Sequence, residues 1–422
     1  MNNRSLDVYA GKQLMGQLQD SNGFWSFKYD QDWLNSANKF AITPSIPLQD
    51  QIILDSGTTR PVQQFFDNLL PEENARELLA KEVKVDHEDS FALLTASGIE
   101  SAGALTLLPE HVDFPSPSAI PLPFAELSRR IKNLPRAPLN IRQSSRMSLA
   151  GAQHKMLVIK LGDELFEGNE GTPSTHILKP DHSEPDQYWQ TTCNEWFMMK
   201  LAKRLGIDVP NVQLIYTPEP AYLVERFDRA GSYPDQERKH IIDSCQLLSY
   251  SRHSKYSAST VETYQKILNN VRPKAATAIK LYQWVIYNLL VGNGDAHLKN
   301  ISFYYENGSA QITPFYDLLS TIIYVSEGGN PLEEALSVPI NDKKRFCDVT
   351  KADVIAFAKE LGIPNSAAVK QLSYFVNNIE SEFSNLYQEL VNMPSADVRA
   401  AELRMLRQVQ FLVVKEMIGR LS

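Results

Sequence analysis

Val291-Gly-Asn-Gly-Asp-Ala-His-Leu-Lys-Asn300 is the stretch of sequence that decides the fold. Before it, residues 275–290 carry apolar side chains at helical spacing, which predicts a helix with one buried face. Gly292 and Gly294 end this helix, and the Ile-Ser-Phe-Tyr-Tyr run that follows has the composition of a strand. The sequence therefore predicts a short loop that holds a carboxylate and a carboxamide between a buried helix and a strand.

The spacing from Asp295 to Asn300 is that of the catalytic loop of protein kinases. In that loop the aspartate accepts the proton of the substrate hydroxyl, and the asparagine holds a magnesium ion. Two alternatives stay open for these residues alone. One is a plain turn, in which Asp, His and Asn side chains bond to the backbone. The other is a metal site formed by Asp295 and His297, although the sequence offers no nearby His or Cys cluster to complete it.

Two further stretches favour the kinase interpretation. Asp317 follows an apolar strand at residues 310–313, where a kinase keeps its second magnesium-binding acid. Lys179 lies on a short apolar strand at residues 175–179, as the nucleotide-binding lysine of a kinase does. The order of the three motifs along the chain, lysine strand, catalytic loop and then magnesium acid, carries more weight than any one of them.

Other motifs extend the pattern over nearly the whole chain. They lie at residues 65–71, 101–107, 148–155, 175–179, 194–197, 224–229, 292–300 and 314–317. With these motifs the chain resembles the HipA-type serine/threonine kinases, the toxin half of HipBA toxin–antitoxin modules. The resemblance implies an α+β, two-lobed protein-kinase-like fold with an added N-terminal α/β subdomain and a mainly helical C-terminal lobe.

The predicted domains follow from this resemblance and from composition. Residues 1–108 are expected to form the N-terminal subdomain, 126–246 the smaller kinase lobe and 247–422 the helical lobe. Between the first two, residues 109–125 contain five prolines, which do not suit a helix and favour a linker.

A loop of Gly, Ala and Ser at residues 148–155 leads into an apolar strand at 156–161. Such a loop can bring backbone N–H groups close to phosphate oxygens, but a plain turn fits the composition equally well. The resemblance implies that this loop covers the phosphates and that Ser148 is the serine these kinases autophosphorylate, which pulls the loop out of the nucleotide site. His154 departs from the pattern, since relatives often carry Glu there.

The expected cofactors are ATP and Mg²⁺, with Asp295 as the catalytic base and Asn300 and Asp317 as the metal ligands. The expected nucleotide-binding residues are Ala152, Gln153, Lys155, Lys179, Glu225, Phe227 and His297. His297 is also placed to support Asp295, or to be structural. Arg226, Asp228 and Arg229 are expected to make structural ion pairs. Glu195 is expected either to pair with Lys179 or to be solvated.

The resemblance also implies partners. Some family members phosphorylate aminoacyl-tRNA synthetases, so a protein substrate of that kind is expected. The family's antitoxin, of HipB type, is a small helix-turn-helix repressor that binds the kinase and operator DNA together. Two alternatives remain: a phosphotransferase with a small-molecule acceptor, and a non-catalytic co-repressor.

Composition fits these expectations. The chain has 422 residues and a net charge of −8, so contact with DNA is expected mainly through the antitoxin. Its three cysteines are few and widely spaced, as in a reduced cytoplasmic protein. No apolar signal core or membrane-spanning stretch is present in the sequence, so no membrane contact is expected.

Periodicity predicts the remaining elements. Residues 5–30 alternate as a small antiparallel sheet does, and residues 325–347 have the composition of a polar loop. A strand pair is expected at 212–216 and 222–227. The expected helices cover residues 186–205, 261–270, 351–361, 366–389 and 397–421.

Overall fold

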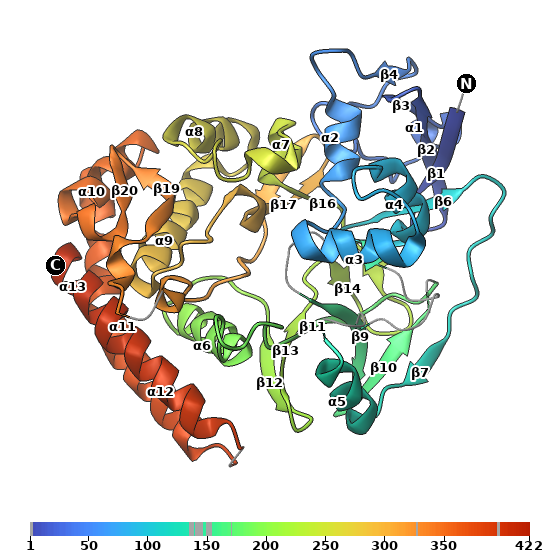
Figure 1. The fold of residues 1–422 in the computed structure, drawn as a ribbon. Coiled ribbons are helices and arrows are strands. Elements are labelled where there is room, and N and C mark those ends of the chain that lie inside the picture. Colours follow the sequence, from blue (N-terminus) through green and yellow to red (C-terminus); the bar gives the residue numbers. More distant parts are fainter. Residues whose placement is uncertain are drawn as a thin grey trace. The chain divides into compact units, whose positions relative to one another are not determined.

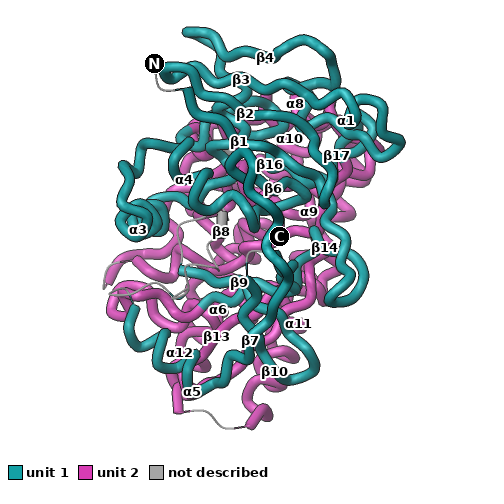
Figure 2. The backbone as a smooth tube through the Cα atoms, turned by 90° about the vertical axis from the view of Figure 1, so that its right-hand side faces the viewer, with its two compact units in different colours: residues 1–179, 225–253, 303–310 teal, residues 180–224, 254–302, 311–422 magenta. Residues whose placement is uncertain are grey.

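The computed structural model describes residues 3–134, 139, 147–148, 154–169, 171–325, 328–394 and 397–422. The chain divides into two compact units, each assembled from three stretches of sequence (Figure 2). Unit 1 comprises Met1–Lys179, Glu225–His253 and Phe303–Ala310, and unit 2 comprises Pro180–Val224, Ser254–Ser302 and Gln311–Ser422. The mixture of helices and strands confirms the predicted α+β class (Figure 1).

Unit 1 begins with an antiparallel sheet in the order β4-β3-β2-β1-β6, which confirms the sheet predicted for residues 5–30. Its strands are β1 (Asn3–Ala10), β2 (Gln13–Ser21), β3 (Phe24–Tyr29), β4 (Ile53–Leu54) and β6 (Leu105–Pro109). Leu6 and Val8 of β1 are fully buried, so the alternation places one face of the sheet in the core. The helices of this part are α1 (Gln31–Asn35), α2 (Pro61–Asp67), α3 (Glu73–Val83) and α4 (Ser90–Ser97).

A second sheet of unit 1 carries the predicted lysine strand. Neighbouring strands there are β11 (His176–Pro180), β9 (Met156–Leu161), β10 (Glu164–Gly168) and β7 (Ala119–Pro121). The last of these lies within the proline-rich segment, where prolines are tolerated because β7 is an edge strand. Helix α5 (Phe124–Lys132) follows it, and unit 1 also contains β16 (Ile241–Asp243), α7 (Ser244–Leu248), most of β17 (Ser302–Glu306) and the first half of β18 (Ser309–Ile312).

A buried ion-pair network joins distant stretches of unit 1. Glu100 of β5 (Glu100–Ser101) accepts a hydrogen bond from Arg226 and another from Arg229 of β14 (Arg229–Ala230). Both have a length of 2.8 Å. Asp228 accepts from Arg226 at 2.7 Å and from Arg229 at 2.9 Å. The structural ion pairs predicted for residues 226–229 are therefore present.

A third arginine, Arg238 of β15 (Glu237–Arg238), completes this group of charges. Its Nη2 lies 3.2 Å from the carbonyl oxygen of Ser101, to which Arg226 and Arg229 also donate, at 3.0 and 3.3 Å. Ser101 in turn pairs in parallel with Ser148 of β8 (Met147–Ser148). The backbone of the predicted phosphorylation site thus lies beside Ser101, whose carbonyl oxygen accepts from three arginines.

Unit 2 is mainly helical. Its helices are α6 (Thr191–Arg204), α8 (Val261–Asn270), α9 (Lys274–Val291), α10 (Lys351–Glu360), α11 (Asn365–Asn392), α12 (Arg399–Val409) and α13 (Lys415–Leu421). A hairpin of β12 (Val212–Tyr216) and β13 (Pro220–Glu225) confirms the predicted strand pair. Helix α11 packs against α6, α9, α10 and α12 (Figure 1).

Helix α9 is more deeply buried than its sequence pattern predicted. We expected one buried face, but from Leu281 to Val291 every side chain except Gln283 is buried. The reason is that α8, α11, α13 and the π-helical turn Gln410–Val414 all pack against it. A helix surrounded in this way is apolar on all sides.

Three other expectations need correction. The helix expected from residue 186 begins at Thr191, because Gln190 has a φ of +54°, which a helix cannot include. The predicted loop at 325–347 contains a hairpin of β19 (Ala335–Ile340) and β20 (Lys343–Arg345), with Val338 and Ile340 buried at a period of two. The helix expected at 397–421 is interrupted by the π-helical turn between α12 and α13.

Candidate active site

The predicted loop is fixed at the end of α9 by Gly292. This residue has a φ of +67° and donates its N–H to the carbonyl oxygens of the last helical turn. A Cβ atom here would lie 2.6 Å from side-chain atoms of Ile322 and Val413. Both the conformation and the space therefore require glycine, and they set the point at which the chain leaves the buried helix.

Two asparagines shape the turn that follows. Asn293 donates to the side-chain oxygen of Asn288 at 2.8 Å, which ties the turn back to α9. The Oδ1 atom of Asn293 accepts the backbone N–H of Asp295 at 3.0 Å. Gly294 donates its N–H to Oγ1 of Thr321 at 2.7 Å. These bonds hold the backbone on the N-terminal side of Asp295 in one conformation.

Asp295 and Asn300 are connected directly. Nδ2 of Asn300 donates to the backbone carbonyl of Asp295 at 2.9 Å. The Oδ1 atom of Asn300 takes no part in this bond and remains an acceptor. The Asn300 side chain is buried, whereas the Asp295 side chain is 51% exposed. The loop therefore presents the carboxylate of Asp295 to solvent and keeps the carboxamide in a fixed orientation.

Asp317 lies on a second segment that is bound to the same loop. Its φ is +54°, a left-handed conformation that non-glycine residues seldom adopt and that often marks a functional site. Its carbonyl oxygen accepts from Nδ2 of Asn293 at 3.3 Å. Thr321 and Ile322 then donate their N–H groups to the carbonyl of Gly292, at 3.0 and 3.2 Å. The segment after Asp317 thus runs alongside the loop that carries Asp295.

Helix α6 supports this segment from the other side. The fully buried Asn194 accepts the N–H of Ser320 at 2.9 Å and donates to the carbonyl of Ser320, also at 2.9 Å. Burial, with the negative charges of Glu195 and Asp317, raises the pKa of the Tyr222 hydroxyl. Glu195 is itself only 3% exposed, so it is not the solvated side chain that was one of the two expectations.

His297 borders the carboxylate of Asp295. Its Nε2 atom lies 4.0 Å from Oδ1 of Asp295, and the side chain is largely buried. The ring meets that of Tyr256 edge to face, with centroids 5.0 Å apart. His297 therefore lies where it can support Asp295.

The expected nucleotide-binding residues lie mostly in unit 1. Lys179 is on β11 and only 7% exposed, and Lys155 directly precedes β9. Glu225, the last residue of β13, is exposed. The carbonyl of Phe227 accepts the hydroxyl of Tyr304 at 3.1 Å. Ala152 and Gln153 lie outside the described residues.

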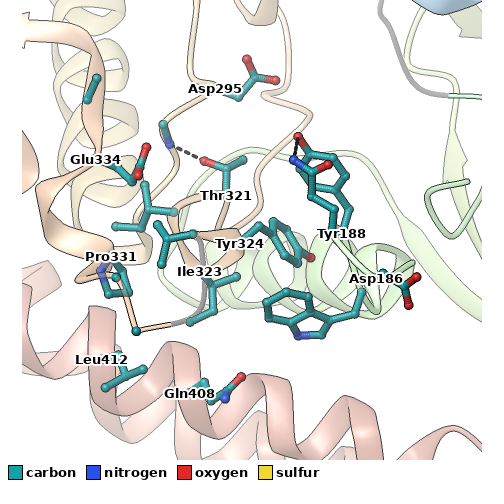
Figure 3. Close-up of a pocket in the computed structure, with 18 residues that line it drawn as sticks. Asp186, Tyr188, Asp295, Thr321, Ile323, Tyr324, Pro331, Glu334, Gln408 and Leu412 are labelled. Atoms are coloured by element: carbon teal, nitrogen blue, oxygen red, sulfur yellow. Dashed lines mark hydrogen bonds between the residues drawn. The ribbon is translucent and has the colours of Figure 1, made fainter. Parts of the chain in front are cut away.

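A large pocket of about 1210 Å³ opens beside Asp295 in unit 2 (Figure 3). The loop with Gly294 and Asp295 forms one border, and Gln408 and Leu412 of the C-terminal helical region form another. The remaining lining residues are Asp186, Gln187, Tyr188, Trp189, Thr321, Ile322, Ile323, Tyr324, Val325, Gly328, Gly329, Pro331, Glu334 and Ala335. Three lining side chains are acidic, those of Asp186, Asp295 and Glu334, and none of the described lining residues is basic.

The donor set fits a magnesium ion that is shared with a nucleotide better than an all-protein metal site. Among the described residues, no three His, Cys, Asp or Glu side chains are grouped so that they could hold a metal. The two expected ligands are the oxygen of one amide, Asn300, and one carboxylate, Asp317, on segments that Asn293 links. Magnesium is commonly bound in this way, by one or two protein oxygens together with phosphates and water.

Sequence reasoning missed the residues that hold the site together. Asn288, Asn293 and Thr321 position the loop, and Asn194 positions the segment after Asp317. The partners of Asn194 lie 126 and 130 positions away in the sequence, and that of Thr321 lies 27 positions away, so no local pattern predicts these contacts. Asn194 lies in the motif at residues 194–197, but the sequence assigned it no role.

The arrangement of Asp295, Asn300 and Asp317 resembles that of a protein kinase site. The three residues lie on two linked loops beside the buried helix α9. A family model described as the HipA-like C-terminal domain matches residues 147–383, and one described as the HipA N-terminal domain matches residues 6–108. The chain belongs to the HipA family of serine/threonine kinases, which confirms the resemblance seen in the sequence.

Individual relatives agree with this assignment. The serine/threonine-protein kinase toxin HipA of Shewanella oneidensis is 32% identical over 396 residues, which cover 89% of this chain and 87% of that protein. The putative kinase Y4mE of Sinorhizobium fredii is 32% identical over 403 residues and 92% of each chain. A chain of the solved complex of HipA, HipB and operator DNA from Shewanella oneidensis MR-1 superposes with a TM-score of 0.80 at 27% identity, over 99% of both chains.

The described residues contain no helix that is both long and apolar enough to cross a membrane.

Proposed function

We propose that this protein transfers the γ-phosphate of ATP to serine or threonine side chains of a protein and acts as the toxin of a toxin–antitoxin pair. The observation that carries the proposal is that Asn300 bonds directly to the backbone of Asp295, while Asn293 bonds to the backbone of both Asp295 and Asp317. Such a fixed arrangement suits phosphoryl transfer, in which positioning and charge stabilisation supply most of the rate.

Each residue of the set then has a role. Asp295 orients the incoming hydroxyl and takes its proton. Asn300 and Asp317 hold magnesium, which neutralises charge on the phosphates. On unit 1, Lys179 and Lys155 contribute positive charge to the phosphates, with Ala152 and Gln153 on the covering loop. Glu225 and Phe227 belong to the segment that binds the adenine.

The pocket beside Asp295 suits the acceptor rather than the nucleotide. Its described lining has acidic but no basic side chains, an environment that repels a triphosphate. Its volume, about 1210 Å³, exceeds the 300–1,000 Å³ that is usual for small-molecule sites. Both features favour a polypeptide acceptor over a small metabolite.

The partner we propose is a small DNA-binding antitoxin of the HipB type. The support is the similarity to a chain of the HipA, HipB and operator DNA complex, which extends over 99% of this chain. The net charge of −8 agrees with DNA contact that is made mainly by the partner.

ATP binding gives the first test. Magnesium-ATP should raise the melting temperature, because a ligand that binds only the folded state at 100 times its Kd stabilises it by about 2.7 kcal/mol. Lys179→Ala should lose most of this shift, since a buried positive charge facing the phosphates is removed. Differential scanning fluorimetry measures both. Lys160→Ala, on the neighbouring strand β9, is the matched control and should keep the full shift. If wild-type protein without phosphate shows no shift, the nucleotide proposal fails.

Phosphorylation of Ser148 gives the second test. A phosphate adds a charge of roughly −1.5 to −2, which would repel the phosphates of ATP. Protein purified from active expression should carry phosphate on Ser148 and bind magnesium-ATP poorly. Protein with Asp295→Ala should lack the phosphate. Peptide mass spectrometry decides the point: Ser148 that stays unmodified in active enzyme after long incubation with magnesium-ATP contradicts the switch.

A further inference from the structure

Tyr256 reaches the catalytic aspartate from a separate segment of unit 2. Its phenol oxygen donates a hydrogen bond to Oδ1 of Asp295, across a sequence separation of 39 residues. Tyr256 is 44% exposed, so burial in the core does not account for its position. The Tyr256 phenol is therefore hydrogen-bonded to one of the two carboxylate oxygens of Asp295, the proposed base.

The segment that carries Tyr256 is anchored to the catalytic loop itself. The carbonyl of Lys255 accepts the backbone N–H of Leu298 at 3.3 Å, three residues after Asp295. The Tyr256 ring meets His297 edge to face, and Nζ of Lys255 lies 5.1 Å from the ring centroid. Tyr256 is thus attached to the same loop as Asp295, and a movement of that loop would carry both residues.

Two roles are compatible with a hydroxyl at this position. Tyr256 could occupy the place of the acceptor hydroxyl and have to leave before catalysis, or it could stay and orient the carboxylate. An occupant that must leave should be held loosely. The backbone bond of Lys255 and the contacts of the ring with His297 and Lys255 fix the phenol on the loop instead.

We propose that Tyr256 is a positioning residue that holds Oδ1 of Asp295, so that Oδ2 faces the acceptor hydroxyl. This inference rests on the proposed kinase function. In the transfer step the acceptor oxygen forms its bond to the γ-phosphorus, and the bond from that phosphorus to the departing diphosphate oxygen breaks. The acceptor proton goes to Oδ2 of Asp295, while Tyr256 keeps its own proton and its bond to Oδ1.

The test is Tyr256→Phe, which removes the hydroxyl and keeps the ring packed against His297. The kcat for phosphorylation of a protein acceptor should fall by about 10-fold or more, since a hydrogen bond to a charged group is lost. The KM for ATP and the melting-temperature shift with magnesium-ATP should not change. In an Asp295→Asn background, the same substitution should cause little further loss, because Tyr256 acts through the carboxylate. Tyr374→Phe, an exposed tyrosine on α11, is the control and should be neutral.

The outcomes separate the alternatives. A higher kcat or a lower KM for the acceptor in Tyr256→Phe would show that the phenol blocks the acceptor position. An unchanged kcat, or a loss that simply adds to that of Asp295→Asn, would also overturn the proposal. Failure of the kinase function itself looks different: wild-type protein would then neither bind magnesium-ATP nor transfer its phosphate.

Discussion

Asp295→Ala is expected to abolish ATP-dependent phosphorylation, with a loss of activity on the order of 100-fold or more, and to relieve any inhibition of growth. Asp295 is half exposed and its side chain is not part of the core, so the fold should survive the change. The backbone bonds that shape the loop come from Asn293, Gly294 and Asn300 and do not need the carboxylate. Transfer of labelled phosphate from ATP measures the effect.

The control for this prediction is Asp342→Ala, an exposed aspartate in the turn between β19 and β20. It removes the same group from the same unit without touching the loop, and it should leave activity near that of the wild type. Full activity of Asp295→Ala, with an unchanged melting temperature, would contradict the assignment of this residue as the base.

Asp228→Asn is expected to destabilise unit 1 by about 3–5 kcal/mol, the cost of breaking a buried ion pair by removing one partner. Asp228 accepts from Arg226 and Arg229 and also from the N–H of Gly103 at 2.8 Å. Without its charge, the buried Arg226 and Arg229 and the half-buried Arg238 would face Glu100 alone. Urea denaturation followed by circular dichroism measures the change as a shift of the transition midpoint.

Asp348→Asn is the matched control, because it breaks an exposed pair with Arg345 and should shift the midpoint far less. A wild-type midpoint for Asp228→Asn would show that the network contributes little to folding.

The same network predicts how stability depends on pH. Burial alone would raise the pKa of Asp228 and of Glu100, but the arginine charges outweigh burial and hold both pKa values below their usual range. A carboxyl whose pKa is lower in the folded state stabilises the fold above its unfolded pKa, which is about 4. This contribution is lost as the pH falls from there through the folded-state pKa. Unit 1 should therefore become less stable below about pH 4, and Asp228→Asn should weaken that dependence.

Local patterns predicted the elements well where one periodicity dominates. Helix α8 has the predicted bounds, residues 261–270, because its apolar face and the Thr260 cap are both local signals. The end of α9 at Gly292 was predicted from the glycines that follow it, which are also a local signal.

The features that the sequence did not reveal depend on contacts between distant residues. The sequence of β19 does alternate between apolar and other residues, but the polar residues on both sides favoured the prediction of a loop. The segment forms a strand because it pairs with β20. Gln190 prevents α6 from beginning earlier, because its φ is positive. Nothing in the type of its side chain predicts this backbone conformation. Tyr256 lies 39 residues before Asp295, so only the folded chain shows that they meet.

The roles proposed above all depend on phosphorylation of proteins by this chain through Asp295. Quantitative phosphoproteomics of cells that express either the wild type or Asp295→Ala tests it most directly. We expect serine or threonine phosphorylation of one or a few proteins, and of Ser148 itself, only with the wild type. Identical phosphoproteomes from the two cultures, at equal amounts of folded protein, would contradict it.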